Sequence, residues 1–263
     1  HTVVKLDVKE PHLWNGMADP YCYTCEASIE KDGEVQDCVA VTYGYRGFHV
    51  DPENGFFLNG KSCPLHGVSR HQDRQDKGWA ISREDHEEDI ALIKEIGANT
   101  IRLAHYQHDQ YFYDLCDHTG FVLWAEIPFI SSFIPGQEAY EKTISQVTEL
   151  ISQNYSHPSI FFWSIGNELT EQGGMAAGYE VSAMLAKTVR NMDSTRLVSG
   201  ALCSFFKGLD NEDNAAFWQT FRKEMPQGGS VINMDNSYGK KIWMEYTAPF
   251  VKDWDVVGYN YLN

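Results

Sequence analysis

The strongest candidate for chemistry is the polar triplet Gly166-Asn167-Glu168, which follows directly on an apolar run. The run, from Ile160 to Ile165, is almost entirely β-branched or aromatic, which is typical of a strand buried on both faces of a parallel sheet. Active sites of α/β barrels are built at the carboxyl ends of such strands. A carboxylic acid beside an amide suits general acid/base catalysis there, because an apolar strand end can raise the pKa of Glu168. The structural alternative is that Asn167 and Glu168 cap the next helix.

The elements that must position this triplet form a repeated strand–helix pattern. Six short apolar segments have the length and composition of strands: 65–69, 99–104, 121–127, 160–165, 196–202 and 255–261. The first helix has a capping-box start, with Asp85 three residues after Ser82, and Gly97 and Gly120 are placed to end helices. Consecutive β-α units predict a parallel sheet with right-handed crossovers. We therefore predict an α/β fold, a (β/α)8 TIM barrel that is incomplete, with about six β-α units.

An open, doubly wound sheet would also accommodate six strands. It is disfavoured because no glycine-rich phosphate turn follows the first strand, and because polar residues follow many strands rather than one switch point. The segment 203–253 is expected to be an irregular connection with helical turns at 215–225 and 240–251.

The first fifty residues follow a β pattern instead. Alternation at 3–8, 21–29 and 35–45 predicts strands, and Asp32-Gly33 between the last two is a hairpin signal. Three or four strands cannot close a sandwich, so we interpret this region as the end of a β-sandwich. The chain starts at His1 without a methionine or a signal-like segment, so we interpret it as an internal piece of a longer protein, and its compartment is unknown.

Charge and composition narrow the possible partners. The chain has 21 Lys and Arg against 37 Asp and Glu, a formal net charge of −16, which argues against nucleic acid and anionic membranes. No apolar run approaches the roughly 20 residues needed to cross a bilayer. Cys22 and Cys25 form a C-x-x-C without a second pair, and in a strand they would point to opposite faces. We interpret them as ordinary buried thiols rather than as a zinc or redox site.

The chain resembles glycoside hydrolase family 2, which includes β-galactosidases, β-glucuronidases and β-mannosidases. The matching segments share the family's order and spacing: 57–61 with 66–73, 97–106, 113–117 with 120–121, and 163–168. Residues 1–50 resemble the end of the family's immunoglobulin-like domain. The resemblance implies a partial immunoglobulin-like β-sandwich over residues 1–52. It implies a glycosidase TIM barrel over residues 53–263, truncated before the strand that carries the nucleophile.

The resemblance implies that Glu168 is the general acid/base, which protonates the glycosidic oxygen and then deprotonates water. A retaining enzyme needs a second carboxylate ~5–5.5 Å away as the nucleophile. In this family that glutamate lies on the strand after Tyr261, beyond the last residue, Asn263, so this chain alone is expected to be inactive. Glu245 precedes the last expected strand and is interpreted as unrelated to catalysis. Glu126, which ends the third expected strand, is expected to support the catalytic groups.

The other implied site residues would bind the substrate. Asn167 would hydrogen-bond the sugar 2-hydroxyl, and His71 and His105 match histidines that hold hydroxyls of the terminal sugar. Arg102 matches an arginine that supports the carboxylates, and Tyr261 matches a tyrosine beside the nucleophile. The residues themselves leave alternatives open, because His71 could be a surface loop histidine, His105 could pack under a loop, and Tyr261 could belong to the core.

The function implied by the resemblance is that of a retaining exo-β-glycosidase without a cofactor. Residues 70–73, Arg-His-Gln-Asp, favour β-D-galactosides; the alternatives are a β-glucuronidase, a β-mannosidase or a non-catalytic carbohydrate-binding barrel. Where magnesium-dependent β-galactosidases have a Glu and a His, this chain has Ile130 and Ser132, so no metal is expected there. Gln107 replaces a proline that is usual in the family. The expected partner is a carbohydrate substrate, and the parent protein could form a homo-oligomer.

Overall fold

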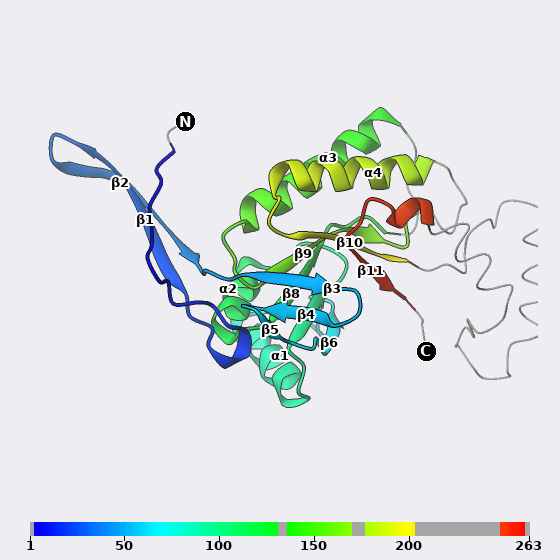
Figure 1. Ribbon diagram of the computed structural model, residues 1–263, viewed down its shortest axis with the longest axis horizontal. Helices are drawn as coiled ribbons and strands as arrows, with labels where there is room; N and C mark the ends of the chain where they lie inside the picture. The colour runs from blue at the N-terminus through cyan, green and yellow to red at the C-terminus, as the bar shows by residue number, and fades with distance from the viewer. Residues whose placement is uncertain (1–2, 131–135, 170–176, 203–247, 261–263) are drawn as a thin grey trace, which may run out of the picture. The chain divides into compact units, whose positions relative to one another are not determined.

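The computed structural model describes residues 3–130, 136–169, 177–202 and 248–260 (Figure 1). They fall into two compact units, which are described one at a time. The first comprises His1–Arg102, His108–Leu123 and Ser156–Phe161, and the second comprises Leu103–Gln107, Trp124–Tyr155 and Phe162–Asn263. The predicted domain boundary between residues 52 and 53 stays a prediction.

The first unit begins with an antiparallel ribbon of β1 (Tyr23–Lys31) and β2 (Glu34–Tyr43). Asp32 and Gly33 between them have φ values of 56° and 84°, as a two-residue type I′ turn requires. This confirms the predicted hairpin. The expected strand at 3–8 is wrong: these residues are exposed and belong to no strand. Alternation alone predicts a strand only where a partner strand is available to pair with it.

One face of the ribbon is apolar and exposed. The cross-strand pair Ala27 and Val39 belongs to this face, as does Ile29, whose side chain is 66% exposed. Cys25 and its partner Val41 lie on the same face. The expectation of ordinary buried thiols is therefore wrong for Cys25, which is an exposed free thiol.

A small sheet and an aromatic core complete the amino-terminal part. The sheet is antiparallel, with strands in the order β3 (Phe48–Asp51), β4 (Gly55–Leu58) and β5 (Lys61–Ser62), and a short 3-10 helix, η1, spans Gly16–Ala18. Phe48 and Phe56 contact Phe161 edge to face, with ring centroids 4.8 and 5.3 Å away. Trp14 is fully buried, and its indole N–H donates to the carbonyl oxygen of Asp117 at 2.8 Å.

The main sheet has six strands, hydrogen-bonded in the order of the sequence. They are β6 (Gly67–Arg70), β7 (Thr100–Leu103), β8 (Val122–Glu126), β9 (Ile160–Asn167), β10 (Leu197–Leu202) and β11 (Val256–Tyr259). Strand β10 pairs in parallel with both β9 and β11. The helices between strands are α1 (Arg83–Glu95), α2 (Gln110–Thr119), α3 (Gln137–Asn154) and α4 (Ala177–Met192). This partial parallel α/β barrel confirms the predicted fold class, and every strand lies within two residues of its predicted ends.

The helix boundaries follow from local chemistry. At the start of α1, the Ser82 hydroxyl accepts from the Asp85 N–H and the Asp85 carboxylate accepts from the Ser82 N–H, which is the predicted capping box. Helix α2 ends at Gly120 in the left-handed conformation, at φ 86°. A Cβ there would lie 2.3 Å from the backbone of Gly16, so the position requires glycine for a second reason.

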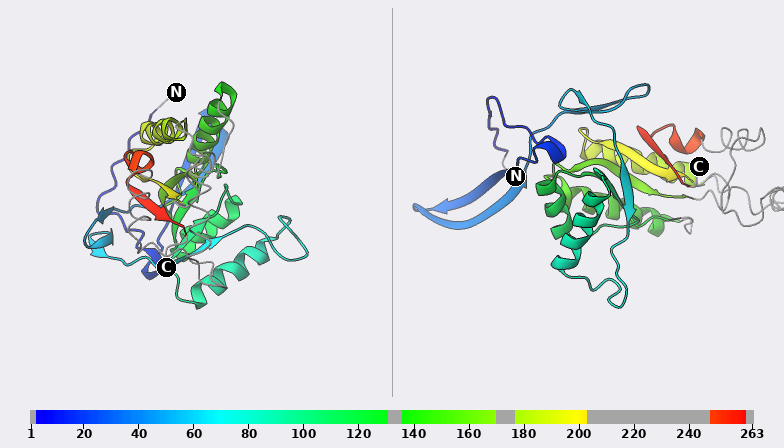
Figure 2. Two further views of the ribbon diagram at one scale, coloured as in Figure 1. Left: turned by 90° about the vertical axis from the view of Figure 1, so that its right-hand side faces the viewer. Right: turned by 90° about the horizontal axis from the view of Figure 1, so that it is seen from below.

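In the second unit, α3 and α4 lie side by side along β9 and β10 (Figures 1 and 2). Strand β9 is completely buried, as its apolar composition predicts. Among the described residues, no helix is long and apolar enough to span a membrane. The turns expected at 215–225 and most of those at 240–251 lie outside the described residues.

Candidate active site

The predicted triplet ends β9, and backbone hydrogen bonds hold its two polar members from both sides. Asn167 and Glu168 are 3% and 6% exposed. The Asn167 N–H donates to the carbonyl oxygen of Phe129 at 2.9 Å, whereas the Glu168 N–H donates to that of Ala201 at 2.8 Å. The pair is therefore fixed between the segment after β8 and strand β10. The alternative of a helix cap involves residues 170–176, which lie outside the described residues.

Gly166 gives the strand end its unusual geometry. Between two of the pairings of β9 with β10, Ser164 with Ser199 and Asn167 with Ala201, β9 holds one residue more than β10, which is a β-bulge. Gly166 has φ 148°, and a Cβ there would lie 2.7 Å from a backbone oxygen. Glu168 itself has φ 53°. The bulge changes the direction in which the following side chains point.

Asn260, which follows β11, joins the two polar residues. Its side-chain Nδ2 donates to Asn167 Oδ1 and to Glu168 Oε1, each at 2.8 Å. Its own backbone N–H donates to the carbonyl oxygen of Leu202, which fixes its position. The sequence analysis missed Asn260, although it lies beside Tyr261, which matches a tyrosine of the family.

Glu126, at the end of β8, is fully buried and accepts hydrogen bonds from three side chains. His105 Nδ1 lies 2.6 Å from Oε1, while the Ser164 hydroxyl and the Trp124 indole N–H donate to Oε2 at 2.7 and 3.2 Å. Because a carboxylate only accepts, the His105 proton is on Nδ1.

Gln107 occupies the position where the family usually has a proline. Its side-chain Nε2 donates to Gln153 Oε1 of α3 at 2.8 Å, which ties the segment after His105 to that helix. A cavity of about 220 Å³ lies beside this contact, lined by Gln107, Glu126 and Glu149 among others.

The remaining predicted residues lie elsewhere. His71 is exposed and Arg102 is half-buried, and both belong to the first unit, whereas His105, Asn167 and Glu168 belong to the second. Tyr261 lies outside the described residues, as do Ser132 and Glu245.

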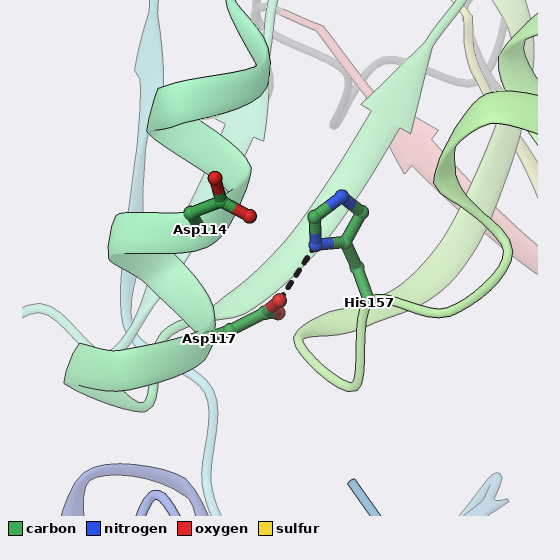
Figure 3. A group of neighbouring side chains, drawn as sticks. All are labelled: Asp114, Asp117 and His157. Atoms are coloured by element: carbon green, nitrogen blue, oxygen red, sulfur yellow. Dashed lines mark hydrogen bonds and ion pairs between the residues drawn. The ribbon is translucent and has the colours of Figure 1, made fainter. Parts of the chain in front are cut away.

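One group of side chains in the described part of the chain has the composition of a metal site: Asp114, Asp117 and His157 (Figure 3). His157 Nδ1 lies 2.6 Å from Asp117 Oδ2, and Asp117 Oδ1 accepts from both the hydroxyl and the N–H of Ser159. Burial raises the pKa of Asp114, and the Asp117 charge adds to this effect. Because Asp117 and His157 Nδ1 already bond one another, we interpret the group as a structural network that holds the start of β9.

Cys22 of the C-x-x-C lies just before β1. Its thiol contacts the carbonyl oxygens of Pro20 and Asp117, and burial raises its pKa to about 12. It is therefore a protonated thiol at neutral pH, as the interpretation against a redox site requires.

The fold and these side chains define a partial α/β barrel that carries carboxylates at strand ends. The chain belongs to glycosyl hydrolase family 2. Residues 50–204 match the family model described as "Glycosyl hydrolases family 2, TIM barrel domain", and residues 1–46 match "Glycosyl hydrolases family 2". The resemblance deduced from the sequence is confirmed.

Named relatives differ in their sugar. A β-glucuronidase of Bacteroides fragilis is 45% identical over 205 residues, which are 74% of this chain and 29% of the relative. The β-galactosidase BoGH2A of Bacteroides ovatus is 30% identical over 224 residues, 78% of this chain and 26% of the relative. A crystal structure of an FMN-binding β-glucuronidase from Facaelibacterium prausnitzii L2-6 has a TM-score of 0.74 at 34% identity, covering 96% of this chain and 46% of that one. This chain thus spans under a third of the length of these two curated relatives.

Proposed function

We propose that the full-length protein is a retaining β-glucuronidase, which removes terminal glucuronic acid from β-glucuronides. The observation that carries this choice of sugar is the 45% identity to the Bacteroides fragilis β-glucuronidase, against 30% to the Bacteroides ovatus β-galactosidase. We therefore propose the alternative from the sequence analysis, a β-glucuronidase, in place of the expected preference for β-galactosides.

The segment 70–73 is a poor guide to the sugar for a physical reason. Arg70 is only 6% exposed, and its guanidinium bonds Asp89, His86 and His108 instead of facing a ligand. A side chain whose hydrogen bonds are all made within the cluster gives no information about which sugar the enzyme binds.

The proposed mechanism begins with Glu168. Its carboxyl proton passes to the glycosidic oxygen as the bond from that oxygen to C1 breaks, while a second carboxylate attacks C1 and forms a glycosyl ester. The ionised Glu168 then takes a proton from the water that displaces this ester. Asn260 holds Glu168 Oε1 throughout, so the other oxygen stays aimed at the departing group.

The sugar is held by residues around this carboxyl group. Asn167 accepts from Asn260 through Oδ1, so its Nδ2 donates to the sugar 2-hydroxyl. We expect His105, whose Nδ1 is bonded to Glu126, to hold a hydroxyl of the sugar. Glu126 acts as a support, because its two oxygens already accept three hydrogen bonds.

The test compares kcat/KM of the full-length protein for 4-nitrophenyl β-D-glucuronide and 4-nitrophenyl β-D-galactoside. We expect a preference for the glucuronide above ~10²-fold, because a site built for a charged group rejects the analogue that lacks it. Glu168→Gln should reduce turnover, whereas Glu138→Gln, on the exposed face of α3, should not. A preference for the galactoside would restore the first expectation. Turnover of neither substrate, with binding of a sugar lactone retained, would favour a carbohydrate-binding barrel.

A further inference from the structure

A cavity of about 460 Å³ lies where α1 and α2 begin, and the residues that line it belong to the first compact unit. Its volume falls within the range of about 300–1,000 Å³ that is typical of small-ligand sites. The lining residues at the two helix starts include Ser82, Arg83, His86, Asp109, Tyr111 and Asp114. Two helices thus contribute polar side chains to one cavity.

His86 lies in the wall of this cavity and is only 2% exposed. Its Nδ1 lies 3.1 Å from Nη2 of Arg70, whose guanidinium is itself held by Asp89. An arginine side chain only donates hydrogen bonds, so Nδ1 accepts, and the proton of the neutral ring is on Nε2. Burial and the charge of Arg70 lower the pKa of His86, so the ring is neutral at neutral pH.

The Nε2–H group of His86 is a donor that faces the cavity. No group in the described part of the chain accepts a hydrogen bond from it, and the Nε2 atom is not enclosed by protein atoms. A metal ion at Nε2 would need the ring proton on Nδ1, which the contact with Arg70 excludes. The group therefore calls for a ligand that supplies a hydrogen-bond acceptor.

The cavity also contains acceptors. Asp109 is the N-cap of α2, and its Oδ1 accepts from the Tyr111 N–H at 2.8 Å. Within the described residues, Asp109 Oδ2 makes no hydrogen bond, and neither does the carboxyl group of Asp114. Figure 3 shows Asp114 beside Asp117 and His157 with no bond to either. One fixed donor therefore faces three carboxyl oxygens, one of Asp109 and both of Asp114.

Contacts between the two helices hold the walls of the cavity in place. The Tyr111 hydroxyl of α2 donates to the Glu87 carboxylate of α1. The Arg83 guanidinium lies over the Tyr111 ring, 4.7 Å from its centroid, and the His86 ring contacts the Phe112 ring with centroids 5.6 Å apart. A ligand that enters a cavity with fixed walls loses less free energy in ordering side chains.

A neutral ligand with several hydroxyl groups matches this set of groups better than a charged ligand. An anion would be repelled by the Asp109 carboxylate, whereas a cation would meet the Arg83 guanidinium and the His86 donor. A hydroxyl group both accepts and donates, so one hydroxyl can accept from His86 while its neighbours donate to the carboxyl oxygens. A single amide has too few donors to bond all of these oxygens.

We propose that this cavity binds a neutral saccharide unit, with His86 Nε2 donating to one hydroxyl and the carboxyl groups of Asp109 and Asp114 accepting from others. The inference goes beyond the proposed function. Glu168 and Asn167 belong to the second unit, so the binding at this cavity does not depend on which sugar the enzyme hydrolyses.

The test measures binding of methyl α-D-glucopyranoside to the full-length protein by isothermal titration calorimetry. This glycoside is neutral, and its α-linkage makes it unsuitable for an enzyme that cleaves β-glycosides. We expect a Kd of about 1 mM, which is the affinity that ordinary contacts give a ligand of this size. The matching α-D-glucuronide, which is an anion, and the matching α-D-glucosaminide, which is a cation, should each bind at least about 5-fold more weakly.

Asp109→Asn is the decisive variant, because asparagine caps a helix as well as aspartate does but replaces the acceptor Oδ2 or its partner oxygen by a donor. The loss of a hydrogen bond to a charged group should raise the Kd about 10-fold or more. His86→Phe should have a similar effect, although it also removes the acceptor for Arg70. Asp32→Asn makes the same chemical change in the turn of the β1–β2 ribbon and is the control that should leave the Kd unchanged.

Hydrogen exchange measured by mass spectrometry locates the bound glycoside. With the glycoside at about ten times its Kd, amide exchange should slow at least about 2-fold over residues 82–86 and 109–114, and it should not change over residues 23–43. Three results would overturn the proposal: no heat of binding up to about 20 mM glycoside, unaltered binding by the Asp109→Asn protein, or tighter binding of the α-D-glucuronide than of the neutral glycoside. Protection confined to other residues would do the same. A protein that binds the glycoside here but does not hydrolyse β-glucuronides would count against the proposed function alone.

Discussion

Replacing Glu126 by glutamine tests whether its carboxylate organises the site. Oε2 accepts from the Ser164 hydroxyl and from the Trp124 indole N–H, which can only donate, so the amide oxygen of the glutamine must occupy this position. The amide NH2 group then faces His105 Nδ1, which is a donor in the parent protein. Either two donors oppose each other, or the His105 proton moves to Nε2.

The magnitude follows from the burial of this group. Glu126 is fully buried, and a lost hydrogen bond to a charged group costs ~1.5–3 kcal/mol. For a domain of this size, each kcal/mol shifts the melting temperature by about 2–4 °C, so the barrel transition should fall by about 3–12 °C. Ser164→Ala is the control: it removes one neutral donor, and its cost should be about 1 kcal/mol.

Scanning calorimetry of the full-length protein measures both effects, and kcat/KM for a glucuronide reports the change at His105. We expect the Glu126→Gln protein to lose activity more than the Ser164→Ala protein does. A Glu126→Gln protein with the parent's melting temperature and the parent's kinetics would refute the reasoning, because the three donors would then not depend on a carboxylate.

Three further changes test other parts of the structure. Gly166→Ala would place a methyl group 2.7 Å from a backbone oxygen, so calorimetry should show destabilisation, and kcat/KM should fall as Glu168 is displaced. Burial, aided by the charge of Arg70, lowers the pKa of His86, so the unfolded chain binds a proton below pH ~6.5 that the folded chain does not. Stability should therefore fall as the pH drops through this range, by at most ~1.4 kcal/mol per pH unit, and denaturation of a His86→Gln variant should show a weaker fall. Asp193→Asn leaves the buried guanidinium of Arg196 without its ion-pair partner and should cost ~3–5 kcal/mol, measured by the shift in melting temperature.

The surroundings of Asp193 stabilise its ionised form, which is why the Asp193→Asn change should cost this much. Burial by itself would raise the pKa of Asp193, but hydrogen bonds from Thr195, Trp163 and Arg196 outweigh it and hold the pKa below its ordinary value. The carboxylate is ionised at neutral pH and fully enclosed by donors, so the neutral amide cannot replace it.

Local signals were sufficient to predict the barrel elements. The apolar run 160–165 predicted a buried strand, and the capping box at Ser82 and the glycine at 120 predicted where helices begin and end. Each of these features depends on residues a few positions apart, so a short stretch of sequence is enough to predict it. The strand predicted at 3–8 was wrong because an alternating pattern does not specify a partner strand, which is distant in the sequence.

The site depends on contacts that are distant in sequence. Asn260 bonds residues 92 and 93 positions away, and Glu126 bonds His105 and Ser164 across 21 and 38 positions. Such contacts follow from strand register, which the composition of a single segment does not determine. The segment 70–73 does not determine the sugar for a related reason, because the Arg70 side chain bonds Asp89, His86 and His108 within the protein.

The assignment of Glu168 as the general acid/base is tested most directly by Glu168→Gln in the full-length protein, assayed with two glucuronides. One should carry an alkyl aglycone, a poor leaving group that needs protonation, and the other 4-nitrophenol, which needs little. The account predicts that kcat/KM falls about 10²–10⁴-fold for the alkyl glucuronide and far less for the 4-nitrophenyl glucuronide. Equal losses for the two substrates would contradict it. If Glu168 supplies the proton, its replacement must affect the poor leaving group more than the good one.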